Sequence, residues 1–164
     1  MFYEDDRLQS VHDIFPSFLT KGQINISKPK NKGVIVAWHA HIHQTDYWYC
    51  IQGSFKVGLM VPCKFYGNAI ERYSALTKKI DKDKEYNKRG FIEEYIGAYR
   101  LEFHYLSDKN PTKHLTIDPF VWHGYMPLEE NSIMLYYLNK KYDPEDVYKT
   151  RPGYFWDGWE IQNR

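Results

Sequence analysis

Three histidines at alternating positions, His39, His41 and His43, are the residues of this sequence most suited to chemistry. On a regular strand, residues two apart project from the same face, so all three imidazoles are expected on one side. A neutral imidazole can accept a proton near pH 7 or bind a metal ion. Because three imidazoles make a poor hydrophobic core, we expect a functional site here. Polar surface histidines, or a hydrogen-bonded core histidine, are the alternative.

A carboxylate and a fourth histidine accompany this group. The residues around the histidines resemble the first cupin motif, in the pattern Gly33-x5-His39-x-His41-x4-Asp46-x6-Gly53. Asp46 stands where Glu is usual, and Pro119-x3-His123 matches part of the second cupin motif. Histidines with one carboxylate suit Fe, Ni, Mn or Zn. A divalent transition metal held by His39, His41, Asp46 and His123 is therefore one alternative, although our leading expectation is a site without a cofactor.

The elements that would carry these residues are short strands. Polar and apolar residues alternate in 23–27, and Leu101, Phe103 and Tyr105 alternate in 101–105; segments 33–43, 113–117 and 132–138 also read as strands. Segments 47–51 and 55–61, joined by a turn at Gln52-Gly53-Ser54, predict a β-hairpin. Short strands separated by Gly, Pro and Asn turns predict an all-β antiparallel sandwich or barrel.

Residues 63–100 differ from the rest of the chain. Apolar residues recur at helical spacing from Ile70 to Ile80 and again from Phe91, and the stretch between them is dense in charges of both signs. We expect a helical insertion with a solvated charged turn. A phosphate contact from this turn is the alternative, through Lys82, Lys84, Lys88 or Arg89.

The composition limits the classes of function. The chain has 164 residues, which suits a single domain over 1–164, and its 22 basic and 21 acidic residues leave a formal charge of +1. No overall field therefore favours nucleic acid or an anionic membrane. The N-terminus has no signal-peptide pattern, no apolar run approaches the roughly 20 residues of a membrane span, and two cysteines make no disulfide framework. We expect a cytoplasmic protein.

A series of short motifs runs through residues 23–62 and about 101–159. In order they are Gln23-x-Asn25-x-Ser27, Gly33-Val34-x4-His39, Gly53, Leu106-Ser107, Pro119-x3-His123-Gly124, Leu135-Tyr136, Tyr142-x-Pro144-x-Asp146 and Phe155-Trp156-Asp157-Gly158-Trp159. Together they resemble the dTDP-4-dehydrorhamnose 3,5-epimerase family of cupins. The resemblance implies a jelly roll, a homodimer, a nucleotide-linked 4-keto-sugar substrate and catalysis without a metal.

The resemblance also implies roles for individual residues. His39 takes the position of the catalytic base and Tyr136 that of the catalytic tyrosine. An imidazole suits proton removal near pH 7, and a phenol, with a pKa of about 10, suits proton donation. The resemblance further implies substrate contacts for His123, Tyr142, Gln23 and Asn25, and we also expect them for His41 and Asp46, which do not come from the resemblance. For Tyr136, Tyr142 and His123, structural packing is the alternative.

The chain departs from the family pattern in three places. Val36 stands where an Arg usually precedes the base, Asp46 where the next strand usually has a Lys, and the sequence ends at Arg164, before the Asp that partners the catalytic His. Asp46 is the candidate to orient His39 instead. In place of the missing Arg and Lys, the negative charge of an enolate would be stabilised by His41, His43, His123 or a backbone dipole.

These residues predict an isomerase. We expect epimerisation of a nucleotide-linked 4-keto sugar at C3, C5 or both, in deoxysugar or surface-polysaccharide synthesis, because the C–H bonds beside a carbonyl can lose a proton to a base. Three alternatives stay open. They are a 3,4-ketoisomerase on the same substrates, a metal-dependent cupin enzyme and a sugar-binding cupin without activity.

Overall fold

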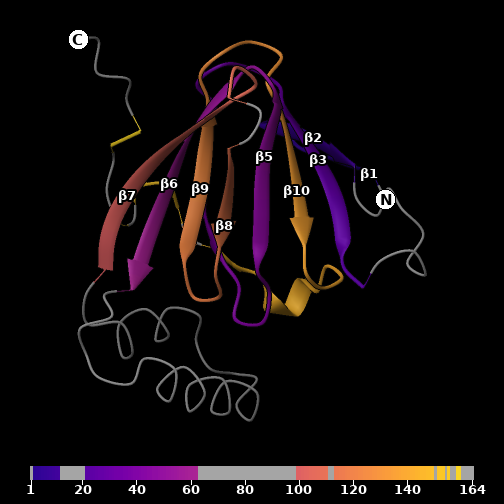
Figure 1. Cartoon of the computed structure of the whole chain (residues 1–164), viewed down its shortest axis with the longest axis vertical. Coiled ribbons are helices and arrows are strands. Elements are labelled where there is room, and N and C mark those ends of the chain that lie inside the picture. The colour runs from indigo at the N-terminus through magenta and orange to yellow at the C-terminus, as the bar shows by residue number, and fades with distance from the viewer. Residues whose placement is uncertain are drawn as a thin grey trace.

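Two antiparallel sheets pack face to face in the computed structural model (Figure 1), which describes residues 2–11, 21–62, 99–110, 113–149, 151–153, 155 and 158–159. Sheet A has the strand order β1 (Phe2–Glu4), β2 (Leu8–Val11), β3 (Gln23–Pro29), β10 (Ile133–Leu138), β5 (Asp46–Gln52) and β8 (His114–Ile117). Sheet B has the order β11 (Tyr148–Lys149), β4 (Val36–Ala40), β9 (Trp122–Pro127), β6 (Ser54–Pro62) and β7 (Tyr99–Ser107). The expected all-β sandwich is confirmed.

The helical content of the described residues is one 3-10 turn, η1 (Pro144–Asp146), between β10 and β11. None of these residues forms a helix with the length and apolar character that crossing a bilayer requires. The predicted helical insertion lies outside the described residues, except that Tyr99 and Arg100 begin β7.

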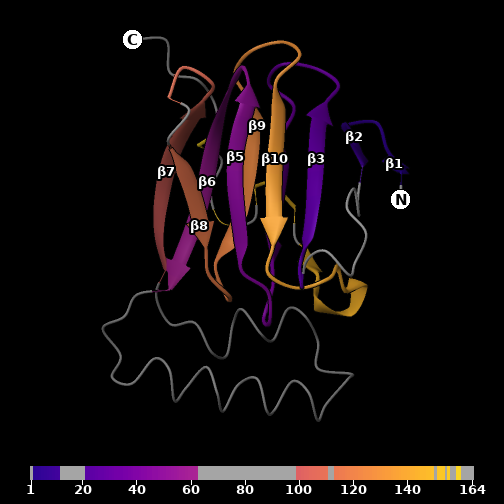
Figure 2. The same ribbon diagram turned by 45° about the vertical axis from the view of Figure 1, so that its right-hand side comes forward.

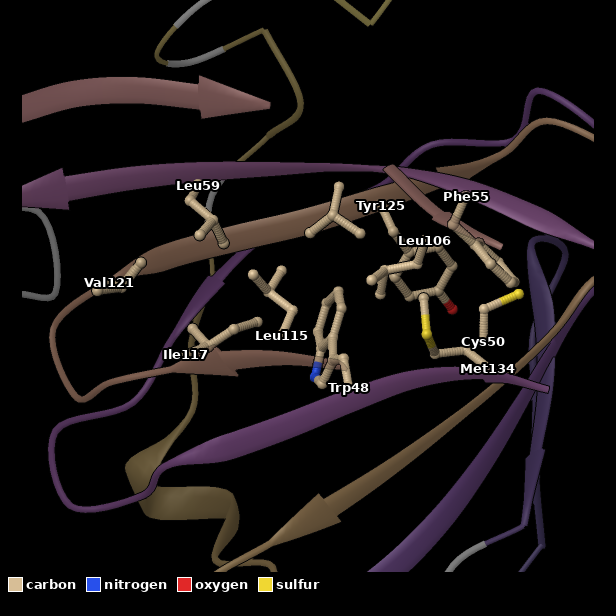
Figure 3. Packing of buried hydrophobic residues seen from close by; sticks show 11 residues of the cluster. Trp48, Cys50, Phe55, Leu59, Leu106, Leu115, Ile117, Val121, Tyr125 and Met134 are labelled. Carbon is tan, nitrogen blue, oxygen red and sulfur yellow. The ribbon is translucent and has the colours of Figure 1, made fainter. Parts of the chain in front are cut away.

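The space between the sheets holds one hydrophobic cluster, to which strands of both sheets contribute (Figure 3). Its buried members are Trp48, Cys50, Phe55, Val57, Leu59, Leu106, Leu115, Ile117, Val121, Tyr125 and Met134. Fully burying a large apolar side chain contributes roughly 1.5–3 kcal/mol, so this cluster holds the two sheets together. Figure 2 shows β5, β10 and β3 side by side in sheet A.

The predicted hairpin at 47–61 is wrong. Both segments are strands, but β5 pairs with β10 and β8 in sheet A, whereas β6 pairs with β7 and β9 in sheet B. The turn at Gly53, with φ of 74°, therefore carries the chain from one sheet to the other. Alternation identifies a strand but not its partner, and Trp48 and Phe55 face the same core from opposite sheets.

A second cluster covers the other face of sheet B, where the C-terminal segment packs. Trp38 contacts the rings of Phe155 and Trp159 with centroid distances of 5.6 and 5.0 Å. The Trp38 indole N–H donates to the Pro152 carbonyl at 2.7 Å, and Lys56 Nζ donates to the Gly158 carbonyl at 2.5 Å. Phe155 and Trp159 therefore pack against sheet B.

Candidate functional site

A group of three histidines and one carboxylate lies between the sheets. His39 on β4 is in register with His123 on β9, His41 follows the end of β4, and Asp46 begins β5 in the opposite sheet. One ligand atom from each residue lies within 4.8 Å of the others. We call these four residues the histidine cluster. His41, Asp46 and His123 are 6%, 2% and 1% exposed, whereas His39 is half-buried and is the member of the cluster that solvent can reach.

Backbone carbonyls orient two of the imidazoles. The Nδ1 atoms of His41 and His123 lie 2.8 Å from the carbonyl oxygens of Asp146 and Val121. A carbonyl oxygen only accepts, so each Nδ1 carries the hydrogen and each Nε2 is left for the cluster. The Nε2 of His123 is buried without a hydrogen bond, 3.7 Å from Asp46 Oδ2.

Asp46 is held as a charged carboxylate. Its Oδ1 accepts a hydrogen bond from Gln44 Nε2 at 2.5 Å, and its Oδ2 accepts one from the Trp48 indole N–H at 3.1 Å. Burial alone would raise the pKa of Asp46, but the neighbouring His123, His41 and Gln44 favour the ionised form and lower it. The cluster therefore contains one negative charge at neutral pH.

The imidazoles of His39 and His41 are neutral at pH 7. Burial lowers the pKa of His39 well below its ordinary value, and the positive charges that His123, His41, Lys149 and Arg7 can carry lower it further. Burial also lowers the pKa of His41, although the charge of Asp46 opposes this shift. Unprotonated imidazoles offer lone pairs, so both residues can accept a proton or bind a cation.

The opposite wall of the site comes from sheet A. Tyr136 on β10 is in register with Asn25 on β3 and with Trp48 on β5. Asn25 hydrogen-bonds to Tyr136 and accepts from Gln23 Nε2 at 2.9 Å, while Gln23 Oε1 accepts the Tyr142 backbone N–H at 2.8 Å. Burial raises the pKa of Tyr136, so its hydroxyl is protonated at neutral pH.

Trp48 joins the two walls. Its ring centroid lies 6.1 Å from that of His39 in a stacked arrangement, 5.2 Å from that of His123 and 6.1 Å from that of Tyr136. Its side chain is 1% exposed. The indole therefore sets the separation of the imidazoles from the tyrosine, and it also supplies a hydrogen bond to Asp46.

Comparison with solved structures finds proteins that share the fold of this chain. No protein-family model and no curated protein matches this sequence. Capsular polysaccharide assembling protein CapF from Staphylococcus aureus matches it in structure with a TM-score of 0.62 and 14% identity, over 92% of this chain and 31% of the CapF chain. This chain spans about a third of the length of the CapF chains that it matches.

Two further structures match this chain over a larger share of their own length. A dTDP sugar isomerase from Desulfovibrio desulfuricans G20 has a TM-score of 0.55 and 14% identity, over 94% of this chain and 82% of that one. The sugar 3,4-ketoisomerase QdtA from Thermoanaerobacterium thermosaccharolyticum, in complex with TDP, has a TM-score of 0.51 and 17% identity, over 77% and 65%. The chain has a cupin fold. Membership of the 3,5-epimerase family stays a prediction.

The cupin strands bring most of the sequence-predicted site residues together. The described structure gathers His39, His41, Asp46 and His123 in one cluster and places Tyr136, Asn25 and Gln23 along the facing wall. Tyr142 is 44% exposed, and its backbone N–H donates to Gln23 Oε1. His43 is not in the cluster, because β4 ends at Ala40 and the chain turns at Ile42, so the expectation of three imidazoles on one strand face is wrong.

Sequence reasoning missed four residues of this cupin site. They are Gln44, Trp48, Asp146 and Lys149. Gln44, Asp46 and Trp48 alternate along the chain, so period-two spacing could have grouped Gln44 and Trp48 with the Asp46 carboxylate. Asp46 was expected to orient His39, but its described contacts are with Gln44, Trp48 and His123.

The histidine cluster fits a divalent transition metal. It offers imidazole nitrogens and one charged carboxylate, which are ligands of Zn, Fe, Mn and Ni. Metal-bound histidines commonly donate their other ring N–H to a carbonyl, as His41 and His123 do. The buried, unpartnered Nε2 of His123 would be satisfied by such an ion.

Proposed function

We propose that this chain is an isomerase of nucleotide-linked 4-keto sugars. It would epimerise C3, C5 or both by removing a proton beside the carbonyl and returning one, in deoxysugar or surface-polysaccharide synthesis. The observation that carries this proposal is that a neutral imidazole, His39, and a protonated phenol, Tyr136, both lie against the ring of Trp48. An epimerase needs such a base and donor on opposite faces of the sugar.

The proposed chemistry uses both groups in turn. His39 takes the proton from the carbon beside the carbonyl, and the electron pair of that bond moves into the carbonyl to form an enolate. Tyr136 then gives its hydroxyl proton to the other face of the same carbon, and both side chains recover their starting states by exchange with water. Low solvent exposure strengthens the electrostatic interactions that stabilise the enolate. Because His39 and Tyr136 exchange their protons with solvent, the proton returned to the sugar is a solvent proton.

Two cations lie near His39 and could hold the diphosphate of such a substrate. Lys149 on β11 is in register with His39 on β4, so both side chains leave the same face of sheet B. Lys149 is exposed, and it lowers the pKa of His39 by charge repulsion, as does Arg7. Arg7 also forms an ion pair with Asp5 at 2.7 Å. These cations take the place of the Arg and Lys that the epimerase resemblance leads one to expect.

The structural neighbours support the substrate class without establishing it. One of them is named a dTDP sugar isomerase, and another, a sugar 3,4-ketoisomerase, was solved with TDP. At 14% and 17% identity they share the fold with this chain. The carbon that reacts, the nucleotide and a homodimeric state therefore belong to the proposal, with 3,4-ketoisomerisation as the sibling reaction.

Deuterium incorporation tests this function. The protein is incubated in D2O with 4-keto-6-deoxy sugars carried on dTDP, GDP, CDP or UDP, and the sugar is analysed by mass spectrometry. Two deuterons indicate epimerisation at C3 and C5, and one indicates a single-carbon epimerase or a ketoisomerase. Absence of exchange with every carrier refutes the proposal and leaves a metal-dependent cupin enzyme or a sugar-binding cupin.

Two variants locate the proton transfers. His39→Asn removes the proposed base and should abolish incorporation, whereas Tyr136→Phe should allow exchange at the face of the base but block inversion. His114→Asn is the matched control, because His114 is an exposed histidine on β8 outside the cluster. Incorporation that survives His39→Asn would remove His39 from the role of base.

A metal-dependent cupin isomerase is a second candidate, and the unpartnered Nε2 of His123 favours it. His39, His41, Asp46 and His123 would hold the ion, which when bound would polarise the substrate carbonyl as a Lewis acid. His39 would then be a ligand instead of a base. Metal analysis of purified protein, with activity measured after chelation and after metal is restored, separates the candidates. Activity that is indifferent to chelation would refute the metal-dependent one.

A further inference from the structure

One buried residue, Asp146, holds the chain segment that carries His41. Asp146 Oδ1 accepts the backbone N–H of Ile42 at 2.8 Å, and Oδ2 accepts that of His43 at 3.0 Å. The backbone carbonyl of the same residue accepts the Nδ1–H of His41 at 2.8 Å. Three consecutive residues are thus bound by a single aspartate that is 7% exposed.

The fold places Asp146 opposite this segment by extending the β4–β11 pairing. Tyr148 is in register with Ala40 and Lys149 with His39, so continuing the same antiparallel register brings Asp146 opposite Ile42. Just before it, Asp143 caps η1 by accepting the Glu145 backbone N–H at 2.9 Å. In Figure 1 the short gold helix lies beside the loop that enters β5.

The hydrogen bonds of Asp146 determine which nitrogen His41 presents. A neutral imidazole exists as two tautomers, and the hydrogen bond at one nitrogen decides which of them forms. The Asp146 carbonyl accepts at Nδ1, so the hydrogen is on Nδ1 and Nε2 keeps its lone pair. The carboxylate bonds to Ile42 and His43 keep that carbonyl in place, because β4 has ended at Ala40.

We propose that Asp146 is the positioning residue of the site, fixing both the place and the tautomer of His41 through the segment 41–43. The consequence for activity rests on the proposed function, whereas the consequence for the tautomer does not. Without the carboxylate, the two amides lose their acceptor, the segment shifts away from η1, and His41 loses the carbonyl that selects the Nδ1–H form.

Nitrogen NMR of the His41 ring measures this tautomer directly. Spectra of protein with ¹⁵N-labelled histidine are recorded in chelator at a pH above the histidine titration range, with assignment by His41→Gln. Wild type should show the Nδ1–H form, and Asp146→Ala should show a mixture of tautomers. Asp143→Ala is the matched control, because it removes the cap of the same helix without touching the 41–43 segment. It should retain the wild-type tautomer.

Two further measurements make the test specific to positioning. Zn²⁺ titration should give an affinity about 10- to 100-fold lower for Asp146→Ala than for Asp143→Ala, as is typical when a partner of a ligand histidine is removed. Asp146→Asn, which keeps one acceptor oxygen, should lie between wild type and Asp146→Ala, and it carries the test if the alanine variant does not fold. Variants that fold yet retain a pure Nδ1–H tautomer and wild-type Zn²⁺ affinity would overturn the proposal. Absence of deuterium exchange in wild type would refute the proposed function. The His41 tautomer and the Zn²⁺ affinity would still test the role of Asp146.

Discussion

The neutral state of His39 predicts how the stability of the protein depends on pH. The unfolded chain should protonate this histidine with its ordinary pKa of 6.5, whereas burial and the neighbouring imidazoles hold the folded-state pKa well below that value. Below pH 6.5 the unfolded state therefore binds more protons than the folded state. Stability is complete above this pH and falls as the pH decreases.

The magnitude follows from proton linkage. At pH 5.5, one unit below its unfolded pKa, a histidine that stays neutral in the fold costs about 1.4 kcal/mol, and the cost is close to zero at pH 7.5. His41, whose pKa is also lowered by burial, contributes with the same sign up to the same amount. Asp46 adds nothing in this range, because its pKa lies below the ordinary 3.8 in the fold. The wild-type protein should lose about 1.4 to 2.8 kcal/mol between pH 7.5 and 5.5 from these two residues.

Urea unfolding in chelator at pH 7.5, 6.5 and 5.5, at constant ionic strength, measures this loss. His39→Asn should remove about 1.4 kcal/mol of the pH dependence. His114→Asn, at an exposed position of β8, should leave the dependence unchanged. Wild type and His39→Asn giving parallel stability curves would refute a neutral, desolvated His39, and with it the proposed base.

Three other substitutions test the packing and the charges around the site. Trp48→Phe removes the indole N–H bound to Asp46 Oδ2, so the free energy of unfolding in urea should fall by about 1.5–3 kcal/mol. An unchanged free energy would show that this hydrogen bond contributes nothing to stability. Gly58→Ala places a Cβ 2.8 Å from Trp38 and 2.9 Å from Trp159, so it should destabilise the protein by about 1–3 kcal/mol in the same assay, whereas Gly153→Ala, with no atom within 4 Å, should not. Lys149→Gln should raise the KM for the nucleotide sugar about two- to fivefold with little change in kcat, and an equal effect of Lys109→Gln would argue against a specific diphosphate contact.

Most strands could be predicted from the sequence because their side chains alternate between core and solvent. Period-two spacing or a short apolar run identified β3, β4, β5, β6, β7, β8 and β10, and turn residues separated them. The same spacing contains no information about the pairing partner. The chain between β5 and β6 was therefore mistaken for a hairpin turn, although Gly53 links two different sheets.

The histidine cluster could be predicted in part for a related reason. His39 and His41 are close in sequence, and the cupin-like spacing pointed to Asp46 and His123, so four residues were proposed together before any contact was known. The expectation for His43 failed because it assumed that the strand continued. Alternation beyond Ala40 is broken by hydrogen bonds to Asp146, which lies 104 positions away from Ile42 along the chain.

Local patterns were enough to predict an all-β chain with a histidine motif, since side-chain alternation and short spacings are properties of neighbouring residues. The charge and orientation of those histidines depend instead on the folded structure. Their protonation depends on burial between two sheets, and their tautomers depend on the carbonyls of Val121 and Asp146. Desolvation and hydrogen bonding act over a few ångströms in space, whatever the separation along the chain, so the chemistry of the cluster arises when the sheets pack.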